Sequence, residues 1–406
     1  MEELKKKFLD LGYTEKQMNK ILNSVQLTTK VLSQNLKNTL DFLTELGFQQ
    51  KEIIEMTLNY PNLLRYSTNN LKQKTDNFKN LGYSKKDFIK MQKELPQLLG
   101  YSIENINNKI KNLLDNGYTN DDILKMTKKL PQLLGLATQN VNQRIDDLIN
   151  LGYDKETVLK MTKTFPSIYS YSTEKINQRI NDFKEIGYSN EEIHKMTKAL
   201  PTLFGFGKEK INARIDDLVA RGYTKDEVME MTKIFPSLYS LSQETVNNRI
   251  DEIIALGYNN DEMIKITTRF PSIYGLSLEN LTQKIEFYNY INLHSLPIRE
   301  PKRLMQSVEL TYARYMFFKD RGIDIDESNS HRLFMGQKRF ETQYGIKKNE
   351  LLEKYKYEDF KRNKSTQELG IETIEEQKDT RFLDDIAREM KQDEKQINKD
   401  DDEERI

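Results

Sequence analysis

The 406-residue sequence contains no cysteine and no tryptophan, and it has only nine prolines and three histidines. Without cysteine the chain forms no disulfide and offers no thiolate as nucleophile or metal ligand. The three histidines, His194, His294 and His331, stand at unrelated intervals and give no metal-ligand spacing. We therefore expect no metal and no cofactor.

Long apolar runs and an excess of one charge are also missing. No stretch approaches the roughly 18 apolar residues that cross a bilayer, so we expect no membrane partner. The 63 basic side chains balance 63 acidic ones. Residues 361–406 hold 10 of the basic and 15 of the acidic groups, which leaves a net charge of only +5 before them. A basic surface must therefore arise from the placement of cations.

Recognisable catalytic motifs are absent as well. The sequence shows no glycine-rich phosphate loop, no paired-carboxylate constellation and no nucleophile motif. Because catalysis has no candidate residues, we interpret the chain as a non-enzyme without a small-molecule substrate.

What the sequence does contain is a repeat of 35 residues, punctuated by a glycine and a proline. Each glycine is followed by Tyr or, once, by Phe48, and the proline is missing only in the first copy, where Gln26 stands. The glycines are Gly12, Gly47, Gly82, Gly117, Gly152, Gly187, Gly222 and Gly257, and the prolines are Pro61, Pro96, Pro131, Pro166, Pro201, Pro236 and Pro271. The period predicts an all-α solenoid with eight repeats over residues 1–291, the first one an N-terminal cap.

Within each copy the punctuation predicts two helices and a short turn. A first helix begins after Gly-Tyr with a capping box and ends before the proline, which is followed by a 3₁₀ turn. The second helix begins at a serine N-cap and ends at the next glycine, where positive φ is needed. The capping boxes begin at Ser84, Thr119, Ser189 and Thr224, and the serine N-caps are Ser102, Ser172, Ser242 and Ser277.

One polar column repeats and is cationic. This cation column consists of Lys74, Lys109, Arg144, Arg179, Arg214, Arg249 and Lys284. At about 100° per residue it lies some 40 to 60° off the centre of the apolar stripe of the second helix, so we expect it to flank a groove. The favoured interpretation is a row of phosphate contacts. The alternative is that each cation pairs with a nearby acid such as Asp146, Asp182, Asp216 or Asp251.

Other columns carry weaker functional signals. A second polar column consists of asparagines, which we interpret as inter-repeat hydrogen bonds to a turn. The alternative is a secondary contact to nucleic acid, although identical residues cannot distinguish bases. This column comprises Asn107, Asn142, Asn177, Asn212 and Asn247. A lysine row on the first helices, Lys93, Lys128, Lys163, Lys198 and Lys233, is interpreted as solvated surface, with phosphate contact as the alternative.

The C-terminal part departs from the period. We expect residues 292–360 to form a degenerate repeat and capping helices, including one closing helix over residues 347–361. Residues 361–406 are too charged and too poor in apolar side chains to build a core, so we expect a disordered acidic tail.

The repeat resembles that of the mitochondrial transcription termination factor family, mTERF. The resemblance is carried by Leu95-Pro-Gln-Leu-Leu99, Gly117-Tyr-Thr-Asn-Asp-Asp-Ile123 and Leu130-Pro-Gln-Leu-Leu134. Near the C-terminus, Arg314-Tyr-Met-Phe-Phe-Lys-Asp-Arg-Gly322 and Phe334-Met-Gly-Gln-Lys-Arg-Phe340 resemble the family's closing segment, with Ala313 where a proline is common.

The resemblance implies a superhelix of repeats that binds nucleic acid along a basic concave face, duplex DNA being favoured over RNA, in transcription regulation or termination. We expect a monomer. Although the family is largely organellar, the first residues run straight into a repeat without a targeting peptide, so we expect a cytoplasmic protein, which a bacterial origin would explain. The alternatives are a protein-interaction scaffold and a single-stranded RNA binder of pentatricopeptide type, whose base code suits uniform columns poorly.

Overall fold

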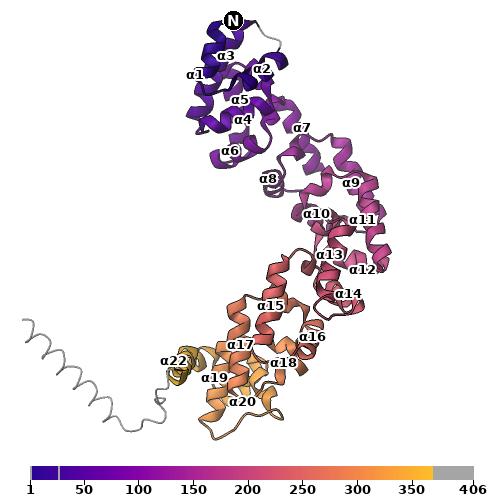
Figure 1. Ribbon diagram of the computed structural model, residues 1–406, viewed down its shortest axis with the longest axis vertical. Helices are drawn as coiled ribbons and strands as arrows, with labels where there is room; N and C mark the ends of the chain where they lie inside the picture. Colours follow the sequence, from indigo (N-terminus) through magenta and orange to yellow (C-terminus); the bar gives the residue numbers. More distant parts are fainter. Residues whose placement is uncertain (1, 26–27, 369–406) are drawn as a thin grey trace, which may run out of the picture. The chain divides into compact units, whose positions relative to one another are not determined.

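The computed structural model describes residues 2–25 and 28–368, and its regular elements in that part of the chain are all helices (Figure 1). From the second copy on, each 35-residue copy folds into helix A, a 3₁₀ turn and helix B. The A helices are α2 (Glu15–Ser24), α4 (Gln50–Asn59), α6 (Lys85–Glu94), α8 (Asn120–Lys129), α10 (Lys155–Thr164), α12 (Asn190–Ala199), α14 (Lys225–Ile234) and α16 (Asn260–Arg269). The predicted all-α solenoid is thus confirmed.

The B helices follow the turns, and α1 (Glu2–Asp10) precedes the first glycine. They are α3 (Thr29–Glu45), α5 (Thr68–Asn80), α7 (Ile103–Asp115), α9 (Thr138–Asn150), α11 (Thr173–Ile186), α13 (Lys208–Val219), α15 (Gln243–Ala255), α17 (Leu278–Tyr290) and α19 (Val308–Lys319). The turns are η1 (Pro61–Arg65), η2 (Pro96–Gly100), η3 (Pro131–Leu134), η4 (Pro166–Ser170), η5 (Pro201–Gly205), η6 (Pro236–Tyr239), η7 (Pro271–Gly275), η8 (Pro301–Met305) and η9 (Ser330–Phe334).

The predicted local signals operate as expected. At Thr119 the hydroxyl accepts from the backbone N–H of Asp122 and the Asp122 carboxylate accepts from the N–H of Thr119, both at 3.1 Å, so the capping box is complete. Leu130, before the proline, leaves the α region (φ −140°, ψ 82°), and η3 begins at Pro131. Gly117 has φ +107°, a conformation that costs other residues strain.

The described residues form two units, one that ends at Leu241 and one that begins at Ser242. In the first, A helices pack on A helices, as α6 does on α8, and B helices on B helices, as α11 does on α13. In the second, α15, α17 and α19 pack in succession, and α16 packs on α18 (Leu296–Arg299). Apolar side chains of the A helices, such as Met126 and Met161, are buried between these layers.

A ninth repeat follows the eight predicted ones, with a shortened first helix. Asn292 stands 35 residues after Gly257 and adopts φ +57°, a left-handed conformation that asparagine tolerates better than most residues. Helix A is reduced to the four residues of α18, so Pro301 comes five residues earlier than the period predicts. Helix α19 and Gly322 then restore the usual order.

The closing segment is also helical but differs from the prediction. Instead of one helix over residues 347–361, the chain forms α21 (Lys348–Lys354) and α22 (Tyr357–Glu368), after α20 (Gln337–Tyr344). Residues 361–368, predicted to begin a disordered tail, belong to α22. The rest of that predicted tail, 369–406, lies outside the described residues. Among the described helices, none is both long and apolar enough to cross a membrane.

Candidate nucleic-acid interface

The cation column lies deeper than predicted. Lys74, Arg144, Arg214 and Lys284 are buried, with exposed fractions of 4 to 7%. Their position corrects the expectation that these four cations flank an open groove. Lys109, Arg179 and Arg249 are half-buried. For these three, phosphate contact stays a prediction.

The column's contacts explain its burial. The Lys74 ammonium donates to the carbonyls of Leu99 and Tyr101, at 2.6 and 2.7 Å, so α5 is tied to the end of the next repeat's turn η2. Lys284 donates in the same way to the Leu304 carbonyl at 2.7 Å. Arg214 and Arg249 donate to the carbonyls of Leu241 and Leu276. At these four positions the column therefore fastens a B helix to the following 3₁₀ turn or to the residues just after it.

At some positions the cation of the column forms an ion pair with an aspartate. Arg144 pairs with Asp147, and Arg179 pairs with Asp182 at 2.6 Å. Of the acids predicted as alternative partners, Asp182 is confirmed, whereas Arg144 uses Asp147 rather than Asp146. Burial lowers the pKa of both Lys74 and Lys284, because ammonium groups lose more hydration than carbonyl acceptors return.

Arg314 is a further member of the column that the sequence reasoning missed. Arg314 is buried and donates to the carbonyls of Leu333 and Met335, at 2.9 and 2.6 Å. Lys74 donates in the same way to two carbonyls at the 3₁₀ turn that follows its helix. The signal was present: Arg314 stands 13 residues after Pro301, the same interval that separates Lys74 from Pro61. Counting from the proline instead of from the glycine would have found it.

The lysine row on the A helices forms a second inter-repeat contact rather than a purely solvated surface. Lys128 pairs with Asp87 at 2.9 Å, Lys163 with Asp122 at 3.5 Å and Lys233 with Glu192 at 2.6 Å. Lys93 pairs in the same way with Glu52. Each of these acids is the third residue of the preceding A helix, so one carboxylate both completes a capping box and binds the next repeat's lysine.

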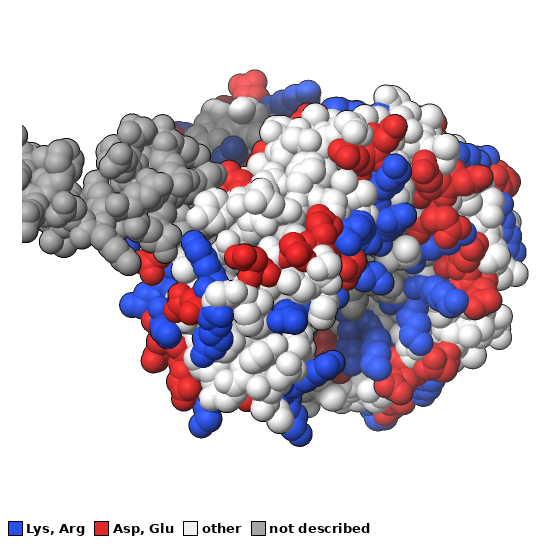
Figure 2. All heavy atoms as spheres, turned by 90° about the horizontal axis from the view of Figure 1, so that it is seen from below, with Lys and Arg blue, Asp and Glu red and all other residues white. Residues whose placement is uncertain are grey.

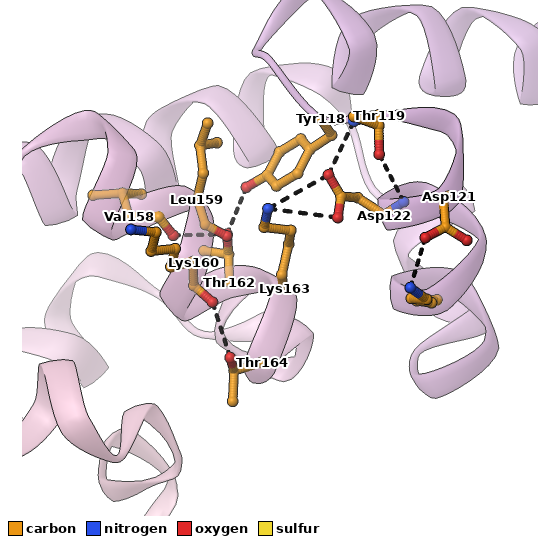
Figure 3. Close-up of polar contacts among 11 residues, drawn as sticks. Tyr118, Thr119, Asp121, Asp122, Val158, Leu159, Lys160, Thr162, Lys163 and Thr164 are labelled. Carbon is orange, nitrogen blue, oxygen red and sulfur yellow. Dashed lines mark hydrogen bonds and ion pairs between the residues drawn. The ribbon is translucent and has the colours of Figure 1, made fainter. Parts of the chain in front are cut away.

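Figure 3 shows how this pair sits beside a buried hydroxyl contact between the same two repeats. The Tyr118 hydroxyl lies 2.5 Å from Thr162 Oγ1, while Lys163 reaches Asp122. Because the Thr162 hydroxyl donates to the Val158 carbonyl at 2.8 Å, the tyrosine is the donor to it. The same contact joins Tyr13 to Thr57, Tyr83 to Thr127, Tyr153 to Thr197 and Tyr188 to Thr232.

One junction between repeats lacks both the tyrosine and the threonine of this contact. Phe48 replaces the tyrosine, and Gln92 stands where the other repeats carry threonine. Gln92 is fully buried, and neither its amide nitrogen nor its oxygen has a hydrogen-bond partner among the described residues. The junction between α4 and α6 therefore lacks the hydroxyl contact of its neighbours.

The asparagine column is the more accessible polar column. Asn107, Asn142 and Asn177 are exposed, and Asn212 and Asn247 are half-exposed. Asn142 accepts hydrogen bonds from the side chains of Asn112 on the preceding B helix and of Asn116 at its C-cap, at 3.2 and 2.9 Å. The expected inter-repeat bond is thus present at Asn142, to side chains rather than to a turn. Contact with nucleic acid stays a prediction.

The second unit carries two open clefts lined by cations that the repeat columns did not reveal. The Arg332 cleft has a volume of about 610 Å³ and is lined by His331, Arg332, Phe334 and Arg339, among others. The Lys302 cleft, of about 470 Å³, is lined by Arg269, Arg299, Lys302 and Arg303 with Glu300. On the face drawn in Figure 2, basic and acidic side chains are interleaved.

The sequence signals for these clefts were short and lay outside the regular period. Arg299-Glu-Pro-Lys-Arg303 places three cations around Pro301, and Phe334-Met-Gly-Gln-Lys-Arg-Phe340 places two after Gly336. Both segments lie after residues 1–291, so the columns of the 35-residue repeat do not include them. No group of His, Asp and Glu that could hold a metal ion occurs in the part of the chain that the structure describes.

Comparison with known proteins agrees with the repeat pattern. The family model for mTERF matches residues 1–150, 138–252 and 222–341. No curated protein matches the chain. Since the three matches together cover residues 1–341, from the N-terminal cap through the ninth copy, the chain belongs to the mTERF family of helical nucleic-acid-binding repeat proteins with transcription-related roles.

Proposed function

We propose that this mTERF-family chain binds duplex DNA through its exposed cations and acts in the regulation or termination of transcription. The observation that carries the proposal is the family match over residues 1–341. The cationic clefts of the second unit support it, because Arg and Lys side chains on an open surface are available to phosphate. We also propose that the protein is a monomer and is located in the cytoplasm.

The interior columns favour binding without a base code. The tyrosine, threonine and lysine positions that join repeats are nearly uniform from copy to copy, and so is the exposed asparagine column. A protein that reads one base per repeat needs residues that vary between repeats. Backbone recognition is therefore favoured over pentatricopeptide-type reading. Within the cation column, Lys109 is the best remaining candidate for a phosphate contact, since it is half-buried and has no ion pair among the described residues.

The experiment is fluorescence anisotropy with duplex DNA, single-stranded DNA and single-stranded RNA of one length and sequence, titrated at several salt concentrations. If about five to seven phosphates are neutralised, log K should fall with log salt at a slope of roughly −4 to −6 on duplex DNA. Tighter binding to single-stranded RNA would contradict the duplex preference, and a slope near zero would contradict phosphate binding. A template bound in this way should also yield shortened transcripts in a run-off assay.

A protein-interaction scaffold is the second candidate function, and one observation favours it. Leu114, Ile149 and Val219 occupy the same position near the ends of α7, α9 and α13, and each is about 40% exposed. Apolar side chains repeated on the surface are typical of docking surfaces on solenoids. A partner that is retained after nuclease treatment, together with no retardation of any nucleic-acid probe, would support the scaffold.

A further inference from the structure

We infer that the Arg332 cleft is a phosphate-binding site for the nucleic-acid backbone, an inference that rests on the proposed function and assigns it to a place in the second unit. Arg332 and Arg339 line the cleft, and the guanidinium group of neither has an ion pair or hydrogen bond to another described residue. No aspartate or glutamate lines it. Both guanidinium groups are thus available to an anion.

The walls of the cleft are held in place by the last member of the cation column. The buried Arg314 guanidinium donates to the carbonyls of Leu333 and Met335 and, at 3.1 Å, to the Gln337 side-chain oxygen. Its Cζ also lies 4.4 Å from the centre of the Phe340 ring. The segment that carries Arg332 and Gly336 is therefore anchored before any ligand arrives, which reduces the entropy lost on binding.

The start of α20 completes the cleft in a way that differs from the A helices. All eight A helices have an acid or glutamine in the first turn that accepts from the N-cap N–H, or an aspartate as the N-cap. Helix α20 instead has Gly336 as its N-cap, without a side-chain hydrogen bond, and carries Lys338 and Arg339 in its first turn. A Cβ atom added to Gly336 would meet nothing within 4 Å, so the space in front of the helix start is open. First-turn N–H groups without a side-chain acceptor favour an anion there.

The neighbouring Lys302 cleft extends the same basic surface. The Arg303 guanidinium lies 4.7 Å from the centre of the Phe334 ring, and these two residues line different clefts. Arg303 and Arg299 are held by Glu300 and Glu327, whereas Lys302 has no such partner among the described residues. Two adjoining clefts suit successive phosphates of one strand better than a single small anion.

The test compares two variants of the full-length chain with a control of equal charge. The cleft variant is Arg332→Gln/Arg339→Gln, and the control is Lys265→Gln/Lys356→Gln, two exposed lysines of the same unit outside both clefts. Each pair removes two positive charges. Duplex DNA affinity is measured against salt. The cleft variant should lose about two phosphate contacts, so its slope should become less steep by about 1.8, while the control slope stays near wild type.

A third variant, Gly336→Asp, separates a phosphate site from a structural role. An aspartate at this position can cap α20 and fills the open space with negative charge, so the thermal midpoint should hold or rise while DNA affinity falls at least tenfold. Equal losses in the cleft variant and the control, or wild-type affinity in Gly336→Asp, would overturn the site and leave the proposed function standing. Failure of the wild-type chain to bind any nucleic-acid probe would overturn both.

Discussion

Replacing Lys74 with methionine tests whether the cation column fastens the repeats together. Methionine keeps an apolar stem as long as that of lysine up to Cε but removes the ammonium group. In the folded chain this group donates to the Leu99 and Tyr101 carbonyls and lies 4.6 Å from the centre of the Tyr66 ring. The substitution therefore disconnects α5 from η2 with little change in packing volume.

The expected loss follows from two opposing contributions. Each hydrogen bond from a charged donor stabilises by about 1.5 to 3 kcal/mol, so two such bonds represent about 3 to 6 kcal/mol. Against this stands the desolvation of a buried ammonium, which costs several kcal/mol and is the reason the pKa of Lys74 is lowered. We expect a net loss of about 2 kcal/mol in the free energy of opening of this junction.

Amide hydrogen exchange measures that loss locally, which suits a repeat array that need not unfold in one step. The N–H groups of Leu98 and Tyr101 in and after η2 should exchange about 30-fold faster in Lys74→Met. The matched control is Lys72→Met, an exposed position on the same helix. If Lys74→Met accelerates exchange no more than Lys72→Met does, the column does not hold the repeats together.

Two further predictions concern the other inter-repeat contacts. Tyr153→Phe should cost about 1 kcal/mol and Thr197→Val about 2 kcal/mol in urea unfolding, because the Thr197 hydroxyl keeps its bond to the Ile193 carbonyl whereas the buried Tyr153 hydroxyl would lose its acceptor; the reverse order would refute this. The Lys233 ammonium, followed by the Ser189 N–H, lowers the pKa of Glu192 to about 2, so its contribution is present above pH 4.5 and lost as the pH falls toward 2. Glu192→Gln should therefore lose less stability than wild type across that interval, and parallel pH profiles would contradict the assignment.

Much of the fold could be predicted because its signals are local. Glycine with positive φ, proline after helix A and the capping boxes act on their own backbone, so each copy specifies its helix boundaries independently. The serine N-caps are confirmed for the same reason: Ser102, for example, accepts from the Asn105 N–H at 3.1 Å. Because the same local signals recur in every copy, they together specify the solenoid.

Whether the cation column faces solvent or the next repeat could not be predicted in this way. An angular position 40 to 60° from the apolar stripe is ambiguous, because it describes one isolated helix. In the array, the next repeat's turn covers that flank, and its carbonyls accept from the cations. Likewise, the five-residue shortening of helix A in the ninth repeat moved Pro301 and Arg314 out of the period, so neither Arg314 nor the cleft that it supports was included among the predicted site residues.

The most direct test of the account measures duplex DNA affinity against salt for Lys74→Met beside Arg332→Gln/Arg339→Gln, with hydrogen exchange on both. We predict that Lys74→Met keeps the wild-type salt slope while its junction opens more often, and that the cleft variant loses about 1.8 in slope while its repeats stay as protected as in wild type. The opposite pattern, with a reduced slope in Lys74→Met and an unchanged slope in the cleft variant, would show that the buried column rather than the cleft contacts phosphate.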